Sequence, residues 1–141
     1  MPEQQIHSVS VAGIVVNDAG DVLVVQREDN GHWEPPGGIL ERDETFEAGV
    51  SREVYEETGI RVEVDELSGV YKNMRLGVVA LVYRCHPVAG QARPTTEAHL
   101  SRWVGPDQIP HLMTPAYAVR VADALQGRIA SRSHDGHSLI R

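Results

Sequence analysis

Residues 38–60 of the chain read GILERDETFEAGVSREVYEETGI, and this stretch decides how the fold around it is organised. Asp43 can cap a helix that begins near Glu44 or Thr45, because its side chain accepts hydrogen bonds from the unpaired amides of a first helical turn. Gly59 is expected to end the helix, since glycine readily adopts the left-handed conformation common at helix C-termini. The stretch therefore predicts one helix bounded by two local signals.

Two kinds of side chain share one side of this helix. An apolar stripe repeats every four residues, at Phe46, Val50 and Val54. Three carboxylates fall within an arc of about 100° that overlaps the stripe, those of Glu53, Glu56 and Glu57. Two like charges about 4 Å apart repel by roughly 4 kcal/mol at an effective dielectric constant of about 20. A divalent cation would remove this repulsion, and ligation by oxygen alone suits Mg²⁺ or Mn²⁺ better than zinc.

The alternative interpretation is a solvated acidic face with no chemistry. It leaves unexplained why the acids gather at the negative end of the helix dipole and beside the apolar stripe. We therefore interpret the acidic helix as a metal site.

The defining residues follow the spacing Gly38-x5-Glu44-x7-Arg52-Glu53, continued by Glu56, Glu57, Gly59 and Ile60. This pattern matches the Nudix box, Gly-x5-Glu-x7-Arg-Glu-U-x-Glu-Glu-x-Gly-U with U an aliphatic residue, at every defined position. The chain thus resembles MutT-like Nudix hydrolases. The resemblance implies an α+β fold, an α/β/α sandwich with a mixed β-sheet between helices. It also implies hydrolysis of a diphosphate bond in a nucleoside diphosphate linked to another moiety, by attack of water at phosphorus.

The resemblance further implies roles for individual residues of the box. Glu53 would be either a further metal ligand or the base that takes the proton of the attacking water. Arg52 would hold Glu53 in place, and Glu44 would belong to the same network. The implied ligands of Mg²⁺, for which Mn²⁺ can substitute, are the backbone carbonyl of Gly37 and the carboxylates of Glu53, Glu56 and Glu57.

Two charged residues outside the box are further candidates. Glu97 lies six residues before Trp103, and in some Nudix proteins a glutamate in such a position joins the metal site. Arg27 is predicted at the end of a strand, where an arginine is frequent in the family and can contact phosphate with two hydrogen bonds. A surface charge remains the alternative interpretation for both residues.

Three more residues are candidates for substrate binding. Trp33 belongs to the WEPPGG lead-in to the box, and Tyr71 lies on a predicted strand. Both could line a pocket for a base or sugar, although aromatic side chains more often pack in cores. Arg75 is a weaker candidate for phosphate binding, on a connecting segment.

The rest of the chain alternates between strand-like and helix-like segments. Residues 8–16 read as a strand buried on both faces, and residues 22–27 as its hairpin partner. Further strands are predicted at residues 61–67, 70–72, 76–85 and 100–104. A last helix is expected between Thr114-Pro115 and Gly127. Residues 1–127 then form a single domain, and the polar residues 128–141, with His134 and His137, form a flexible surface tail.

Composition limits the classes of function. The chain has 141 residues, a mass of 15.5 kDa and a formal net charge of −7, which argues against broad binding of nucleic acid or anionic membrane. It carries neither an apolar run long enough to span a membrane nor a signal-peptide pattern. The single cysteine, Cys85, excludes an intramolecular disulfide and is expected to be a small buried residue. We therefore expect a cytoplasmic enzyme.

Two competing functions stay open beside the hydrolase. One is a catalytically silent Nudix-like domain that senses a nucleotide, although such domains usually lose a box carboxylate and none is lost here. The other is an isoprenoid diphosphate isomerase, which the mid-strand position of Cys85 disfavours. The identity of the substrate and the number of metal ions are not decided by the sequence, and a homodimer is left open.

Overall fold

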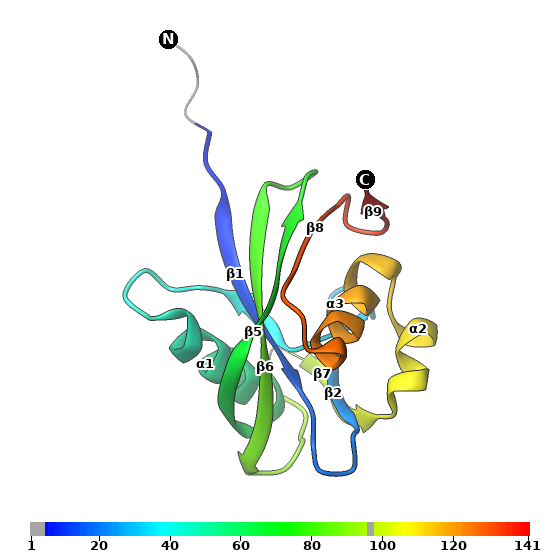
Figure 1. Ribbon diagram of the computed structural model, residues 1–141. Helices are drawn as coiled ribbons and strands as arrows, with labels where there is room; N and C mark the ends of the chain where they lie inside the picture. Colours follow the sequence, from blue (N-terminus) through cyan, green and yellow to red (C-terminus); the bar gives the residue numbers. More distant parts are fainter. Residues whose placement is uncertain (1–4, 96–97) are drawn as a thin grey trace.

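The computed structural model describes residues 5–95 and 98–141. A six-stranded mixed sheet runs through the centre of the molecule in the order β4-β1-β6-β5-β8-β9 (Figure 1). Strand β1 is parallel to β6 and β5 is parallel to β8, whereas the other neighbours are antiparallel. The strands are β1 Ser8–Val15, β4 Gly37–Ile39, β5 Arg61–Asn73, β6 Val78–Ala89, β8 Ala130–His134 and β9 Leu139–Ile140.

A smaller antiparallel sheet has the order β3-β2-β7. Its strands are β3 Trp33–Glu34, β2 Val22–Arg27 and β7 Ala98–Val104. The helices are α1 Phe46–Thr58, α2 Ile109–Leu112 and α3 Pro115–Gln126, with a 3₁₀ turn at Pro106–Gln108. None of the helices within the described residues is long and apolar enough to cross a membrane.

Helices cover both faces of the large sheet, with α1 on one side and α2 and α3 on the other (Figure 1). Strand β1 shows why, because its side chains alternate between two hydrophobic cores. Ala12 and Ile14 pack in the core beneath α3, and Val11 and Val15 pack in the core beneath α1. The predicted strand buried on both faces and the predicted α+β sandwich are therefore confirmed.

Helix α1 begins and ends at local capping signals. The Thr45 hydroxyl accepts a hydrogen bond from the Ala48 amide at 3.1 Å, and Gly59 ends the helix with φ 80°. The predicted C-terminus is confirmed, but Thr45 rather than Asp43 is the N-cap. The predicted apolar stripe is wrong for Phe46, which is 43% exposed at the first residue of α1.

Strands β1 and β2 do not form the predicted hairpin. They are joined by the expected turn, but they share only one bridge, Val16 to Val22. Both edges of β1 are already occupied, by β4 and β6. Strand β2 therefore pairs with β3 and β7 in the second sheet instead.

The C-terminal segment differs from the flexible tail that its composition suggested. Strand β8 pairs with the edge of β5 and β9 folds back on β8. Its polar composition is that of a short edge element, with one face in solvent. His134 is only 1% exposed, so the expectation of a surface histidine there was wrong.

Candidate active site

Strand β4 lies between β1 and the C-terminal half of α1, and two glycines make this approach possible. A side chain on Gly37 would collide with the backbone of Val11, and a side chain on Gly38 would collide with the Glu53 carboxylate. The Gly37 amide donates a hydrogen bond of 2.7 Å to Oε1 of Glu57. The double glycine thus brings a backbone strand directly against two carboxylates of the helix.

Arg52 is the centre of the carboxylate cluster. Its guanidinium lies 2.6 Å from Glu44 Oε1, 2.7 Å from Glu53 Oε1 and 3.3 Å from Glu56 Oε2. It also donates to the backbone carbonyl of Ile39 at 3.1 Å. Arg52 therefore ties α1 to the loop before it and to the end of β4.

This arrangement fixes the protonation state of the loop glutamate. The Arg52 guanidinium lowers the pKa of Glu44 from its usual 4.5 to about 2, aided by the hydrogen bond from the Glu41 amide. The same contacts raise the pKa of Arg52. Both groups are consequently charged at any pH near neutrality.

The three carboxylates of the box differ in exposure. Glu53 is 7% exposed and Glu57 is 4% exposed, although both sit on a helix, whereas the Glu56 side chain is 42% exposed. Two of the three predicted acids thus lie on the core side of α1. They sit beside Val50 and Val54, as predicted from the overlap between the carboxylate arc and the apolar stripe of this helix.

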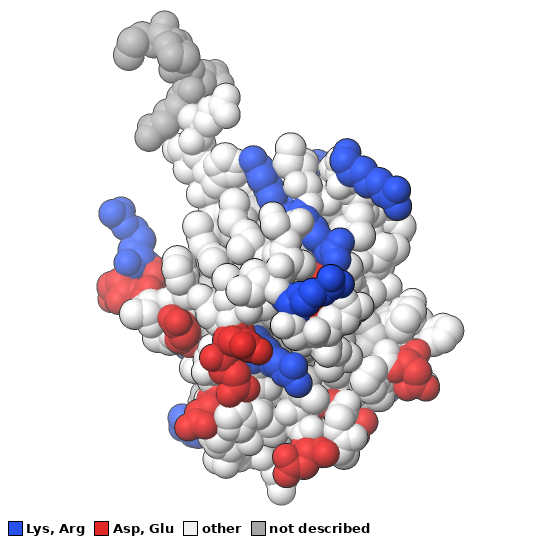
Figure 2. Space-filling model, viewed as in Figure 1, with Lys and Arg blue, Asp and Glu red and all other residues white. Residues whose placement is uncertain are grey.

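A hollow of about 650 Å³ opens above these groups. Acidic side chains gather on the surface over α1 and the segment that leads into it (Figure 2). The hollow is lined by Arg27, Gly37, Gly38, Ile39, Glu41, Arg52, Glu53, Glu56 and Glu57.

The donor set suits a hard divalent cation, since carboxylates and backbone carbonyls are oxygen ligands. Within residues 5–95 and 98–141, no three acidic or histidine side chains stand ready as a metal cage. Instead, Glu53 and Glu57 are held by Arg52 and by the Gly37 amide. The cradle that Gly38 leaves for the Glu53 carboxylate, together with the burial of Glu53 and Glu57, nevertheless fits a cation held at this wall.

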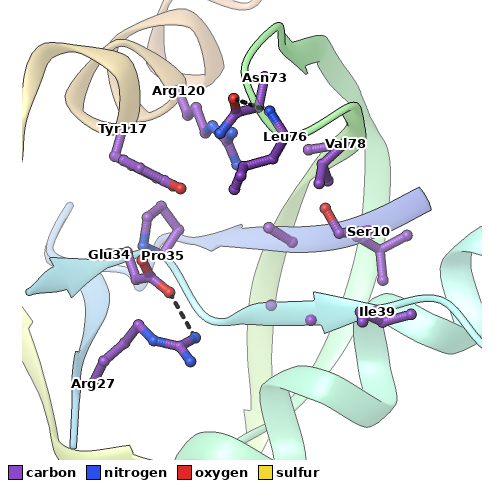
Figure 3. A pocket seen from close by; sticks show the side chains of 15 residues that line it. Ser10, Arg27, Glu34, Pro35, Ile39, Asn73, Leu76, Val78, Tyr117 and Arg120 are labelled. Carbon is purple, nitrogen blue, oxygen red and sulfur yellow. Dashed lines mark hydrogen bonds and ion pairs between the residues drawn. The ribbon is translucent and has the colours of Figure 1, made fainter. Parts of the chain in front are cut away.

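A second pocket of about 190 Å³ adjoins the hollow and shares Arg27 and residues 37–39 with it (Figure 3). Tyr117 and Arg120 reach it from α3, while Asn73, Leu76 and Val78 come from the β5–β6 hairpin. Glu34 and Ser10 complete its polar lining. The two cavities therefore share the wall formed by residues 37–39.

The structure brings only one of the four predicted substrate-binding residues to these cavities. Arg27 lines both and is paired with Asp29 at 3.0 Å and with Glu34 at 3.3 Å. Glu97, the fifth predicted metal ligand, lies outside the described residues.

The other three residues predicted to bind substrate lie outside both cavities, and the prediction is wrong for Tyr71, which is fully buried. Trp33 packs against the core under Arg102. Tyr71 is fully buried and donates to Asp123 at 2.7 Å, as expected for an aromatic side chain that finds a core site. Arg75 is exposed on the β5–β6 turn and lines neither cavity.

Arg120 is the most notable residue that sequence reasoning missed. A signal was present, because Arg120 lies one turn after Ala116 and one turn before Ala124. All three are buried. An arginine in the middle of such a row predicts a buried cation.

Comparison with known proteins gives a consistent result. The NUDIX domain family matches residues 6–124. A MutT-like protein from Streptomyces ambofaciens is 57% identical over 136 residues, covering 96% of this chain and 88% of its own length. A putative 8-oxo-dGTP diphosphatase from Bacillus subtilis is 30% identical, covering 81% of this chain and 77% of its own. An ADP-ribose pyrophosphatase from Methanocaldococcus jannaschii is 31% identical over 74% of this chain and 66% of its own.

Solved structures share the fold. A NUDIX hydrolase from Nitrosomonas europaea superposes with a TM-score of 0.79 at 24% identity, over 94% of this chain and 82% of that chain. A MutT NUDIX hydrolase from Burkholderia pseudomallei superposes with a TM-score of 0.75 at 27% identity, over 84% and 98% of the two chains.

Proposed function

Because this chain belongs to the Nudix family of pyrophosphohydrolases, we propose that its site hydrolyses a diphosphate bond in a nucleoside diphosphate linked to another moiety. One observation carries the proposal. Two buried carboxylates, Glu53 and Glu57, face an open hollow and are fixed there by Arg52 and the Gly37 amide. Buried carboxylates beside a cavity, each with an assigned partner, are typical of a catalytic site rather than of a solvated helix face.

Nudix enzymes generally depend on a divalent metal. We assign Mg²⁺, with Mn²⁺ as a substitute, to Glu56, Glu57 and the Gly37 carbonyl, with Glu53 beside them. A cation bound there would neutralise phosphate oxygens and lower the pKa of a water molecule.

The chain's own groups would position the reactants. Glu53, oriented by Arg52 at 2.7 Å, accepts the proton of the attacking water, whose oxygen bonds to phosphorus as the bridging P–O bond breaks. Arg27 supplies positive charge where the hollow meets the adjoining pocket. Positioning and charge neutralisation of this kind account for most of the catalysis of phosphoryl transfer.

The test is turnover of a substrate panel with Mg²⁺ or Mn²⁺. The panel contains 8-oxo-dGTP, ADP-ribose and other nucleoside diphosphate derivatives, because relatives carry names of those two activities. We expect turnover of at least one compound, and we expect Glu57→Gln to reduce kcat/KM by about 1,000-fold. Glu47→Gln is the matched control, since Glu47 is exposed in the first turn of the same helix.

Unchanged turnover in a folded Glu57→Gln variant would remove catalysis from this site. Metal binding without turnover on the whole panel would favour the nucleotide-sensing alternative.

A further inference from the structure

Arg120 is a buried cation that forms no ion pair among the described residues, although the more distant Glu34 carboxylate attracts it. It is 7% exposed, and no carboxylate of the described residues lies within ion-pairing distance of its guanidinium. Its Nε–H is buried and has no hydrogen-bond acceptor. Burial lowers the pKa of this guanidinium, which reflects the cost of holding the charge away from water.

Two tyrosine rings offset part of that cost. The guanidinium carbon lies 4.6 Å from the ring centre of Tyr117 and 5.0 Å from that of Tyr71. Such contacts stabilise a cation but satisfy none of the directional N–H donors of its fork.

His134 does not supply the missing acceptor. Its Nδ1 accepts a hydrogen bond of 2.9 Å from the Gly136 amide, which can only donate. Burial and the nearby Arg120 charge lower the pKa of His134, so the ring is neutral. A neutral ring with an unprotonated Nδ1 carries its proton on Nε2, and that nitrogen faces Arg120 Nη2 at 3.3 Å. His134 therefore positions Arg120 by packing and leaves the buried Nε–H without an acceptor.

The unsatisfied cation forms part of the wall of the pocket that adjoins the carboxylate hollow (Figure 3). Leu76, Val78 and Ala80 give this pocket an apolar lining, and Tyr117 gives it an aromatic one. Apolar and aromatic walls suit a planar ring. A guanidinium fork suits two adjacent acceptor atoms on the edge of such a ring, as it does with O6 and N7 of a keto-purine.

Resting on the proposed function for the diphosphate, we propose that Arg120 is a specificity-determining residue. Its fork binds the carbonyl-bearing edge of a heterocyclic base attached to the diphosphate. An amino group at the same position would set donor against donor, so amino-substituted bases are discriminated against. The substrate class is thus a nucleotide with a keto base rather than one with adenine.

The test compares IMP and AMP, which differ at the C6 edge and contain no diphosphate bond. Equilibrium binding to the wild-type protein is measured by calorimetry. We expect IMP to bind roughly tenfold more tightly than AMP, a typical discrimination for one bidentate pair. In Arg120→Gln the IMP affinity should fall by about tenfold while the AMP affinity changes by less than about twofold.

Arg84→Gln is the matched control. Arg84 also packs against α3, donating to the Ala124 carbonyl at 3.2 Å, but it does not line the pocket. The control should keep the preference for IMP. If Arg120→Gln fails to fold by circular dichroism, Arg120→Lys keeps the charge without the planar fork and should lose most of the preference.

Equal affinity of the wild type for IMP and AMP, or no measurable binding of either, would overturn the proposal. Equal weakening of both ligands in the Arg120 variants would also overturn it, because that pattern is expected of a purely structural residue. These outcomes do not depend on hydrolysis. If the wild type prefers IMP but Glu57→Gln leaves turnover unchanged, only the proposed function is refuted. If Glu57→Gln abolishes turnover but the wild type binds IMP and AMP equally, only this inference is refuted.

Discussion

Arg52 and Arg120 use the same side chain on opposite sides of the central sheet. Arg52 on α1 contacts three carboxylates within 3.3 Å, and its charge is compensated entirely by the protein. Arg120 on α3 is more deeply buried, and among the described residues it contacts two tyrosines and a neutral histidine but forms no ion pair. The difference separates two uses of a guanidinium. Arg52 uses its donors to hold the carboxylates of the proposed catalytic site, and in our proposal Arg120 keeps its donors for a ligand.

The comparison predicts opposite consequences of deletion. Removal of Arg52 leaves carboxylates without their cation in a half-buried site, which should disrupt the geometry of the hollow. Removal of Arg120 deletes a buried charge that the tyrosine rings and the more distant Glu34 compensate only in part, which should stabilise the fold.

The largest effect is expected for Arg52→Ala. Glu53 would lose its 2.7 Å partner and Glu44 would lose its 2.6 Å partner, so kcat/KM should fall by about 100-fold. Steady-state kinetics on the best substrate of the panel measure this loss. Arg102→Ala is the control, because Arg102 stacks on Trp33 away from the hollow. A fall of less than about twofold would contradict the bracing role of Arg52.

A smaller effect, of opposite sign, is expected for Arg120→Met. Methionine fills a similar volume between Tyr71 and Tyr117 without a buried charge, so the free energy of unfolding should rise by about 1 kcal/mol. Urea denaturation at neutral pH measures the change. A loss of stability would mean that the two ring contacts outweigh the cost of burial, and it would weaken the comparison.

The smallest effect is expected for the pH dependence of stability that arises from the interaction between Arg52 and Glu44. Arg52 holds the pKa of Glu44 at about 2, below the usual 4.5. Their interaction therefore stabilises the fold fully above about pH 4.5 and is lost as the pH falls toward 2. The stability difference between the wild type and Glu44→Gln should be constant from pH 7 to 5 and shrink below pH 4.5. Urea midpoints across this range measure it, and a difference that is undiminished at pH 2.5 would refute the assignment.

The sequence predicted the box region better than the rest because its signals are local. Helix limits follow from capping chemistry, and burial of Glu53 and Glu57 follows from helical periodicity beside Val50 and Val54. The Arg52 contacts agree with the family pattern. Two details of this region were wrong. Phe46 is exposed, and the N-cap is Thr45 rather than Asp43, although both side chains have the chemistry of a cap.

The adjoining pocket was not predictable in the same way because it is assembled from distant segments. Tyr117 and Arg120 meet Asn73 and Leu76 only through the packing of α3 against the sheet. Tyr71 was expected to line a pocket but is buried in the core. Arg120 was not singled out from the sequence, but it lines the pocket. Periodicity marks a side chain as inward-facing, but it does not say whether a core or a cavity lies inward.

Strand β4 has a consequence for how such a protein can evolve. Residues 37–39 form a wall common to both cavities, and glycine is required at 37 and 38 by close contacts on either side. Any shift of this wall that reshapes the second pocket also moves the backbone against which the Glu53 and Glu57 carboxylates rest. New substrate preferences should therefore arise through α3 and the β5–β6 hairpin, where a side chain can change without disturbing the rate of bond cleavage.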